Sequence, residues 1–486
     1  MVDLVQYEQA FESFWAELLE EEYQHGAGLK ETFDIVPIFE RHAALFTEDI
    51  VRSLLGQREG RAAKYVARFA CEMHLADQVK HATEEIANAE TADRIEWDGQ
   101  ELAYRYASTV LANEPEPSRR HDLERRIVAC TDSHNDLRRA RWERLHQQAA
   151  ALGFPDYAAM CEALSGIELE ALADEMRLLL DRTHDTYFDA LERQAQVLGV
   201  PRSELTRGDI GHLFRGPQFD GMFPADRLIP ALRQTLGGLG IDLDSQRNVP
   251  LDTEVRPLKS PRAFCVPVRV PHDVRLVMMP KGGQDDYSSL MHEAGHLEHF
   301  AHCDADARAA YRYLGDNAVT EGWAFLFDYL VETETWLTSV LVDNDYGDFL
   351  DLAGFMNLWF LRRYAAKLLY ELELHRGAAF DAAPERYRDR LSAALGVQIW
   401  PEDYLFDVDD GFYCAAYLRA WALERQLRRR LKSDHGEAWF ASRAAGETLR
   451  ALWRRGQEPT ADEIAREIGD KGIEFGYLIE DLLDSR

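Results

Sequence analysis

Basic residues are scarce in this chain of 486 residues, which has 55 Lys and Arg against 86 Asp and Glu and a formal net charge of −31. Nucleic acids and anionic membranes attract basic surfaces, so this balance disfavours both as general partners. It leaves open an acidic cavity that favours cationic ligands. The sequence also lacks any uncharged apolar run long enough to cross a bilayer, so we expect no transmembrane helix.

Cysteine is also scarce. The six cysteines are widely spaced and form no CxxC pair, so the sequence predicts neither a thiolate zinc site nor a disulfide framework. Cys265, Cys303 and Cys414 are interpreted as buried small apolar residues. The first residues, MVDLVQYEQAFESFWAELLEEEYQ, are acidic and amphipathic and lack the basic start and apolar core of a signal peptide. These features together predict a reducing, cytoplasmic location.

Strand-like alternation is rare, whereas apolar residues recur at spacings of three and four through most of the chain, which predicts a mostly α fold. The chain is too long to fold around one ordinary hydrophobic core, so we expect two regions, 1–200 and 201–486. Helices are expected up to about residue 110, with breaks at His25–Gly28, at Gly56–Gly60 and near Asn88. A single long helix is expected from Glu168 to Leu198.

One segment, 241–280, departs from the helical pattern. It is rich in β-branched residues and prolines, which predicts a small sheet. Its last part, Val274 to Met279, is expected to be an edge strand whose backbone, including Val274 and Leu276, could pair with an extended peptide. A strand that only packs is the equal alternative. Gly282 and Gly283 follow it in a loop that would let backbone approach a substrate.

The stretch MHEAGHLEHF, Met291 to Phe300, carries the strongest chemical signal. In a helix His292 and His296 project from one face, a spacing that lets two imidazoles share one zinc ion, and Glu293 flanks them. Gly295 is costly inside a helix, by about 1 kcal/mol relative to alanine, which indicates close approach of another backbone or of substrate. His299 is expected to be structural rather than a ligand.

A catalytic zinc site needs a third protein ligand and an open position. Glu321 is the candidate, because it lies in the apolar helix predicted within Gly315–Glu332, where an unpaired carboxylate is expensive. The 25 residues after His296 allow the first helix to end and a second to return beside it. A glutamate placed for the helix dipole is the alternative. Asp328 is a candidate to orient an imidazole, or else a surface acid.

These residues resemble a known family. HEAGHLEH is similar to the HEFGHALH-type helix of the thimet oligopeptidase and oligoendopeptidase F zinc metallopeptidases, and Glu321-Gly322-Trp323 resembles their Glu-x-Trp at the matching offset. Two further similarities are weaker. LGFPDYAAM, from Leu152, resembles a signature of the family's upstream helices, and the segment from Arg256 to Ala263 resembles the residues that precede its active-site strand. The related helical zinc carboxypeptidases share the general architecture and a similar ligand set.

The resemblance implies a helical, two-sided clamshell with a deep channel, one wall formed by 1–200 and the catalytic part, with metal helices at 285–332, by 201–486. It implies one Zn²⁺ per chain held by His292, His296 and Glu321, with Glu293 as general base. The chain departs from the family late in the sequence, where acidic residues replace a histidine. Tyr413 and Tyr417 remain there as candidate oxyanion donors.

The predicted activity is therefore zinc-dependent hydrolysis of short peptides by a monomer or homodimer. Arg419 stands where the family has a tyrosine and is a candidate anchor for a substrate carboxylate, which would favour a carboxypeptidase instead. The missing histidine keeps a third alternative open, a peptidase-like binding protein with impaired catalysis. A chance HExxH in a helical interaction protein would require Glu321 to lie far from His292 and His296.

Overall fold

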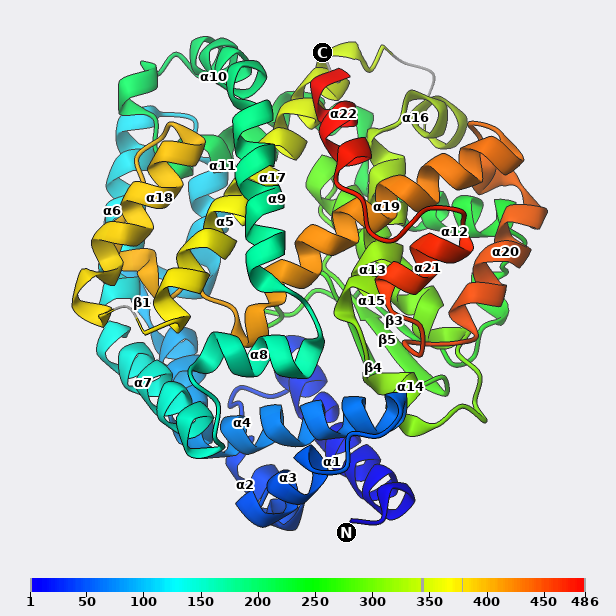
Figure 1. Ribbon diagram of the computed structural model, residues 1–486. Coiled ribbons are helices and arrows are strands. Elements are labelled where there is room, and N and C mark those ends of the chain that lie inside the picture. The colour runs from blue at the N-terminus through cyan, green and yellow to red at the C-terminus, as the bar shows by residue number, and fades with distance from the viewer. Residues whose placement is uncertain (1, 342–344, 378, 485–486) are drawn as a thin grey trace.

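The computed structural model describes residues 2–341, 345–377 and 379–484. It is mostly helical, as predicted, and it contains two small sheets, of which only the one within 241–280 was predicted. In Figure 1, α1–α4 lie at one end of the molecule, and most of the remaining helices lie on two sides above them. The first group comprises α1 (Leu4–Gly26), α2 (Val36–Arg41), α3 (Glu48–Leu55) and α4 (Arg61–Ala92).

An aromatic cluster holds the first four helices together. Phe11 and Phe14 of α1 are fully buried, and Phe14 packs edge-on against Phe39, Phe46 and Phe69. The predicted breaks near residues 26 and 56 are confirmed, but the break near Asn88 is wrong. Asn88 stays helical because its side-chain amide exchanges hydrogen bonds with the main chain of Phe33, at 3.0 and 3.3 Å.

A hairpin and a run of helices follow. They are β1 (Arg94–Trp97), β2 (Gln100–Ala103), α5 (Tyr104–Asn113), α6 (Pro117–Asp132), α7 (Asn135–Ala151), α8 (Tyr157–Ser165), α9 (Leu169–Arg182), α10 (His184–Leu198) and α11 (Arg207–Arg215). The expected single helix over Glu168–Leu198 is wrong, because it breaks at Thr183. The buried Arg362 donates to Leu180 O and Thr183 Oγ1, both at 2.7 Å, and so satisfies polar groups at this break.

The second sheet lies in the predicted segment and contains β3 (Leu251–Asp252), β4 (Phe264–Arg269) and β5 (Asp273–Val277). Its order is β3-β5-β4, with β5 parallel to β3 and antiparallel to β4. The prediction of an edge strand at Val274–Met279 is therefore wrong. Val274 and Leu276 are fully buried, and the two edges of β5 are paired within the sheet. The prolines that suggested an edge lie at its boundaries instead.

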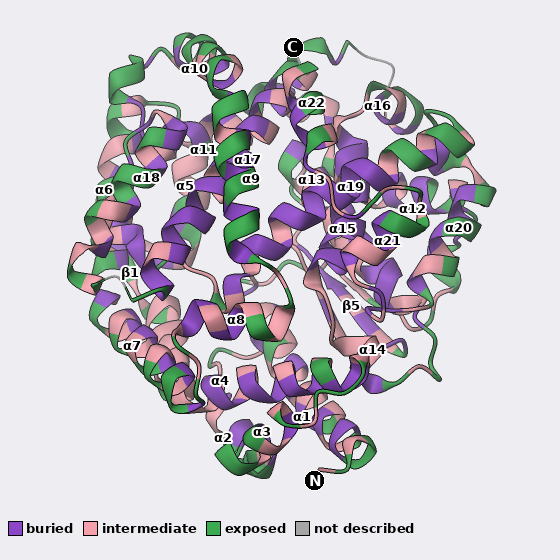
Figure 2. Cartoon of the chain, in the orientation of Figure 1, coloured by how far each residue is buried: buried purple, intermediate pink, exposed green. Residues whose placement is uncertain are grey.

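The remaining helices complete the body. They are α12 (Leu228–Gly238), α13 (Gln284–Ala301), α14 (Ala309–Tyr313), α15 (Asn317–Asp328), α16 (Glu334–Val340), α17 (Gly347–His375), α18 (Ala383–Leu395), α19 (Tyr413–His435), α20 (Arg443–Trp453), α21 (Ala461–Glu467) and α22 (Gly476–Asp484). Figure 2 shows that α13, α15 and α19 are largely buried.

The chain after residue 201 packs against both sides of the molecule, since α17 contacts α9 on one side and α19 on the other. The division at residue 200 and the channel between two walls stay predictions. Within residues 2–341, 345–377 and 379–484, the helices are too short or too polar to cross a membrane.

Candidate active site

The site begins with two helices that cross at very short range. A Cβ on Gly295 of α13 would lie 2.4 Å from Trp323 O and 2.5 Å from Ala324 Cα of α15, closer than real carbon atoms approach. Only glycine allows this contact. The expected close approach of another backbone is thus confirmed, and it brings Glu321 of α15 to the face of α13 that carries His292 and His296.

Three donor atoms converge at this crossing. Glu321 Oε2 lies 3.4 Å from His292 Nε2 and 3.5 Å from His296 Nε2. The side chains of the two histidines are only 15% and 13% exposed, and that of Glu321 is 3% exposed. Two imidazole nitrogens and one carboxylate oxygen form a common ligand set for zinc. The alternative in which Glu321 lies far from the histidines is therefore wrong.

The second atom of each donor group is anchored by a neighbour. His292 Nδ1 lies 3.7 Å from Asp328 Oδ2, and Ser288 donates a hydrogen bond to the other oxygen of Asp328. His296 Nδ1 is hydrogen-bonded to Thr320 Oγ1 at 2.9 Å. These contacts orient both Nε2 atoms toward Glu321, which is the arrangement that partners of metal ligands usually provide.

Glu321 itself shows how a cation fits this site. The Tyr413 hydroxyl donates to Oε1 at 2.5 Å, whereas Oε2 is buried and has no hydrogen-bond partner among the described residues. A buried carboxylate oxygen without a hydrogen bond is costly unless nearby positive charge compensates it. A divalent cation between Oε2 and the two imidazoles would remove that cost, so the residues present fit a zinc ion.

Electrostatics favour positive charge at the same point. Burial opposes ionisation of Glu321, yet His296 and His292 outweigh it and hold the pKa of this carboxyl below its ordinary value. Burial likewise disfavours the charged form of His292, but Asp328 and Glu321 raise the pKa of His292 well above its usual range. The carboxylates therefore stabilise added positive charge, whether it is a proton or a metal ion.

Glu293 lies beside the cluster and is held by the sheet. Its Oε2 accepts a hydrogen bond from the Cys265 N–H at 2.8 Å. Burial raises the pKa of Glu293, and Glu321 adds to this effect, whereas the histidines oppose it. Because Cys265 belongs to β4 and pairs with Leu276 of β5, its N–H toward Glu293 identifies the outer edge of β4 as the edge that faces the site.

The two tyrosines of α19 take different positions. Tyr413 contacts the candidate ligand Glu321 directly. Tyr417 is packed among aromatic rings, with Phe325 at 5.4 Å, Tyr364 at 5.3 Å and Tyr413 at 5.3 Å between ring centroids. Burial is the main cause that raises the pKa of both phenols, and the Glu321 charge adds to it, so both remain hydrogen-bond donors at neutral pH.

Arg419 does not match the prediction of a carboxylate anchor. Its guanidinium forms two 2.8 Å hydrogen bonds with Asp316, the N-cap of α15, and one with Asp462 at 2.8 Å. It is 8% exposed. These internal carboxylates occupy the fork that a substrate carboxylate would need, so Arg419 is a structural tie between α19, α15 and α21.

Other predicted residues lie outside the cluster. The backbone of Val274 and Leu276 is paired within the sheet, as described above. Gly282 N–H donates to Asp286 at 2.8 Å and Gly283 N–H donates to Phe223 O at 2.9 Å, so these glycines form the turn into α13. His299 is fully buried and stacks on Phe300, and it is not one of the three converging residues, as expected.

Sequence reasoning missed two supporting groups, Thr320 and the Cys265 N–H. Thr320 directly precedes Glu321, and on a helix a neighbour one position away is expected to point elsewhere, so the spacing gives no warning. The backbone N–H of Cys265 is invisible in a residue pattern. The only sequence signal for its role is its position directly after the segment Arg256–Ala263, which weakly resembles the family.

No protein-family model matches the sequence, and no curated protein matches it either. Solved structures do match. PZ peptidase A, solved with an inhibitor, has a TM-score of 0.71 at 16% identity over 96% of this chain and 87% of that chain. A protein provisionally named oligoendopeptidase F from Bacillus anthracis has a TM-score of 0.64 at 16% identity over 98% and 84% of the two chains.

A third structure, also provisionally named oligoendopeptidase F, has a TM-score of 0.63 at 15% identity and covers 96% of this chain and 86% of that chain. This chain has the fold of these peptidases. The resemblance inferred from HEAGHLEH and Glu321-Gly322-Trp323 is thus confirmed in the fold. The likeness covers at least 96% of this chain, so it includes N-terminal helices in which the sequence analysis identified no family motif.

Proposed function

We propose that this protein hydrolyses peptide bonds in short peptides and that it depends on one zinc ion per chain. The convergence of His292, His296 and Glu321, with a buried carboxylate oxygen at its centre that has no hydrogen bond among the described residues, carries the proposal. The shared fold with peptidases supports the same chemistry. The two imidazoles and the Glu321 carboxylate would hold the ion, and Glu293 would act as the general base.

The chain's own groups explain the proton transfers. When bound, the ion would supply a Lewis acid that polarises the scissile carbonyl and acidifies water. Glu293 has one oxygen fixed by Cys265 N–H, which leaves Oε1 to accept a proton from the attacking water and pass it to the leaving amine. Its raised pKa brings the carboxyl closer to neutral pH, where it can both take and give a proton.

Two further roles follow from position. Tyr417 would donate to the oxyanion that develops on the substrate, because Tyr413 already donates to Glu321. The substrate would align as an extended strand along the outer edge of β4, where Cys265 lies beside Glu293. This assignment replaces the earlier one to Val274 and Leu276, whose strand has no outer edge in the sheet.

The test uses a short peptide with both termini blocked and an internal fluorescent reporter pair. We expect the zinc-loaded wild type to cleave it, and Glu293→Gln to lose at least about 10³-fold in kcat while it keeps its zinc. Glu298→Gln is the matched control. Glu298 lies on the same helix, and its carboxylate accepts from Gln246 at 3.0 Å, outside the cluster, so this variant should remain active.

The outcomes separate the alternatives. Cleavage only of peptides with a free C-terminus would favour a carboxypeptidase, although Arg419, the residue that suggested one, is engaged by Asp316 and Asp462. A wild type that binds zinc and peptide without cleavage would instead indicate the peptidase-like binding protein. Full activity of Glu293→Gln would refute the proposed mechanism. A cytoplasmic location and a monomeric or homodimeric state stay predictions.

A further inference from the structure

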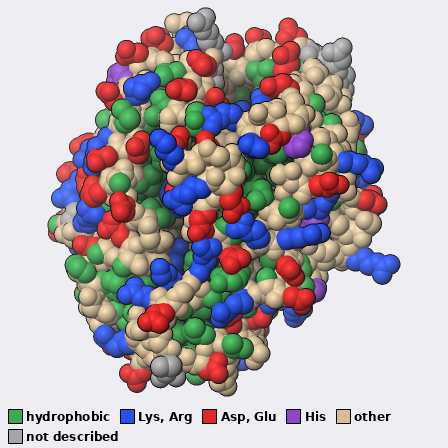
Figure 3. All heavy atoms as spheres, turned by 45° about the vertical axis from the view of Figure 1, so that its right-hand side comes forward, with side chains coloured by type: hydrophobic (Ala, Val, Ile, Leu, Met, Phe, Trp, Pro, Cys, Tyr) green, Lys and Arg blue, Asp and Glu red, His purple; other side chains and the backbone are tan. Residues whose placement is uncertain are grey.

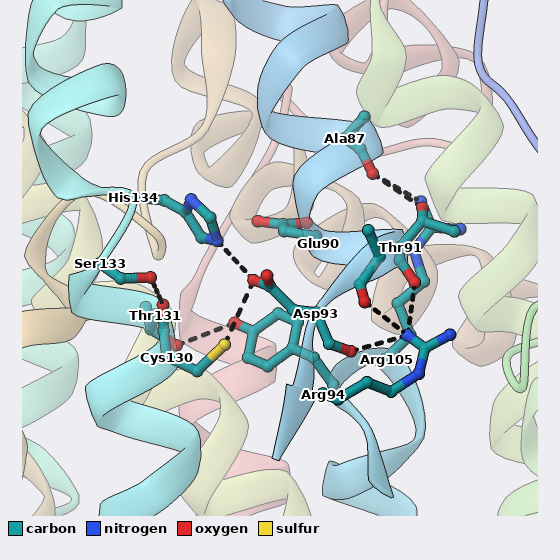
Figure 4. A network of polar contacts seen from close by, with 12 residues as sticks. Ala87, Glu90, Thr91, Asp93, Arg94, Arg105, Cys130, Thr131, Ser133 and His134 are labelled. Carbon is teal, nitrogen blue, oxygen red and sulfur yellow. Dashed lines mark hydrogen bonds and ion pairs between the residues drawn. The ribbon is translucent and has the colours of Figure 1, made fainter. Parts of the chain in front are cut away.

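A second group of metal-ligand side chains lies on different elements from the candidate active site. It consists of Asp93, which directly follows α4, Cys130 near the end of α6, and His134, which directly precedes α7. Figure 4 shows the His134 ring and the Cys130 sulfur pointing at the carboxylate of Asp93. Cys130 and His134 are four positions apart in the chain and contact Asp93 from the same side, at the end of α6 and just before α7.

The three side chains meet at one oxygen. Asp93 Oδ2 lies 2.6 Å from His134 Nε2 and 3.3 Å from Cys130 Sγ. The donor atoms of the three residues all lie within 4.8 Å of one another. His134 is 12% exposed and Asp93 is 29% exposed, so the cluster is sheltered and still open to an ion from solvent.

We propose that Asp93, Cys130 and His134 bind a second divalent metal ion, with zinc as the preferred ion, and that this site is structural. A thiolate, an imidazole nitrogen and a carboxylate oxygen are all zinc ligands. One thiolate, one carboxylate and one neutral imidazole together neutralise the charge of a divalent ion, which lowers the cost of burying it. Binding would release the thiol proton of Cys130 to solvent. The neutral His134 ring would carry its proton on Nδ1, which frees Nε2 to bind the ion.

The geometry needs only small adjustments. Ligand bonds of about 2.0–2.3 Å at tetrahedral angles separate neighbouring donor atoms by roughly 3.3–3.8 Å. The sulfur and oxygen are already at 3.3 Å, and the nitrogen and oxygen at 2.6 Å would separate by rotation of side chains. Glu90, one turn before Asp93 on α4, lies beside the cluster in Figure 4 and is held by Arg138 at 2.6 Å. Glu90 or water would fill the fourth position.

The surrounding structure supplies a reason for such a site. Cys130 packs at the edge of a small core, separate from the main one, in which only Ile95, Tyr104, Ala107 and Leu123 are buried. This core joins the β1–β2 hairpin to α5 and α6. This core is small, and a metal ion beside it would add a link between the end of α4, α6 and the start of α7. The ion would connect Asp93 to residues 37 and 41 positions away.

The sequence analysis did not identify this site, because Cys130 and His134 are not part of a CxxC pair and Asp93 lies 37 and 41 positions away from them. It is independent of the peptidase proposal, since none of its residues belongs to the cluster around Glu321. The test must therefore distinguish the two ions. The thiolate provides the distinction, because the His292–His296–Glu321 set contains no sulfur ligand.

The experiment replaces zinc by Co²⁺ in the full-length protein and records the near-ultraviolet absorption, where a thiolate bound to cobalt gives a charge-transfer band. We expect this band in the wild type and in His292→Ala/His296→Ala, and its loss in Cys130→Ser. Cys265→Ser is the control, because Cys265 is the cysteine of β4 beside Glu293 and would be the source if the band came from the catalytic centre.

Metal content and stability complete the test. Zinc analysis should find one more ion per chain in the wild type than in Cys130→Ser or His134→Gln. Removal of zinc should lower the Tm of the wild type more than that of either variant. If Cys130→Ser does not fold, His134→Gln provides the same comparison. A wild type without the cobalt–thiolate band, or with the same zinc content as His134→Gln, would show a metal-free hydrogen-bonded cluster and overturn the proposal.

Discussion

At the scale of single residues, each candidate ligand of the active site divides its two polar atoms between two tasks. His292 and His296 direct Nε2 to the centre and Nδ1 to Asp328 or Thr320, and Glu321 directs Oε2 to the centre and Oε1 to Tyr413. An imidazole or carboxylate held at its far atom loses little freedom when an ion binds. These neighbouring groups would therefore contribute to the affinity of the site for the proposed metal ion.

Substitutions of Tyr413 and Tyr417 are predicted to affect different properties, zinc affinity in the first case and kcat in the second. Tyr413→Phe removes the 2.5 Å hydrogen bond to Glu321, so we expect zinc affinity to fall by about 10–100-fold. Tyr417→Phe removes the proposed oxyanion donor, so we expect kcat to fall by about 10²–10³-fold with zinc affinity unchanged. Zinc titration and steady-state kinetics at saturating zinc measure the two effects separately. Equal effects of both variants on kcat, without any change in zinc affinity, would contradict this division.

His299 is predicted to make stability depend on pH. Burial lowers the pKa of His299 to about 3. Below its ordinary pKa of about 6.5 the unfolded chain binds a proton that the folded chain does not, so stability falls as pH falls through this range. Between about pH 6.5 and pH 5 the loss amounts to about 2 kcal/mol.

Thermal unfolding at several pH values measures this loss. His299→Gln should show a smaller decrease of Tm between neutral and mildly acidic pH than the wild type. His81→Gln is the matched control, because His81 is exposed on α4, and it should behave like the wild type. The same acid sensitivity in His299→Gln and wild type would mean that other groups dominate the response.

At the scale of elements, the sequence was most informative where one spacing determines one geometry. The four-residue spacing of His292 and His296 predicted their common helix face, and the isolated carboxylate in an apolar helix identified Glu321. The order of strands was not predictable, because it depends on pairing between distant segments: β3 pairs with β5 across more than twenty residues, and this made β5 central.

Other elements were missed because a distant partner decides them. The β1–β2 hairpin has the two-residue turn Asp98-Gly99, a local signal that helical periodicity on both sides obscured. The break at Thr183 depends on Arg362, which lies 179 residues further along the chain. The prediction that Arg419 anchors a substrate carboxylate was likewise wrong, because its partners Asp316 and Asp462 are distant in the sequence and close only in the fold.

The crossing of α13 and α15 is predicted to be intolerant of a single methyl group. In Gly295→Ala the new carbon would collide with Trp323 O and Ala324 Cα, so the helices must move apart, and we expect a loss of about 1–3 kcal/mol or more together with weaker zinc binding. Gly237→Ala is the matched control. Gly237 is helical with open space around it, so alanine should raise stability by about 0.4–1 kcal/mol.

Thermal unfolding of the two variants, with and without added zinc, measures this difference. The contrast between them separates the effect of the contact from the general effect of replacing a helical glycine. A Gly295→Ala variant as stable as the wild type would show that α13 and α15 can separate without cost. The site would then not depend on this contact for its geometry.

At the scale of the whole molecule, the chain has 86 acidic and only 55 basic residues. Figure 3 shows acidic and basic side chains interspersed on one face, without one large area of a single sign. The many ion pairs, such as Arg363 with Asp407 and Arg120 with Asp209, take up basic residues inside the fold. On this face the net charge of −31 therefore acts at long range rather than through a single patch.

The electrostatic field of this negative charge is predicted to make kcat/KM depend on the charge of the substrate. A cationic blocked peptide should be cleaved with a higher kcat/KM than an anionic one of the same length, because the negative molecule attracts it. Added salt screens the attraction, with a Debye length of about 10 Å at 0.1 M, so kcat/KM should fall for the cationic peptide and rise for the anionic one. A neutral peptide of the same length is the control for effects of salt on catalysis itself. Steady-state rates over a series of salt concentrations provide the measurement. If the three peptides respond in parallel, local contacts in the site, and not the charge of the whole molecule, determine the preference.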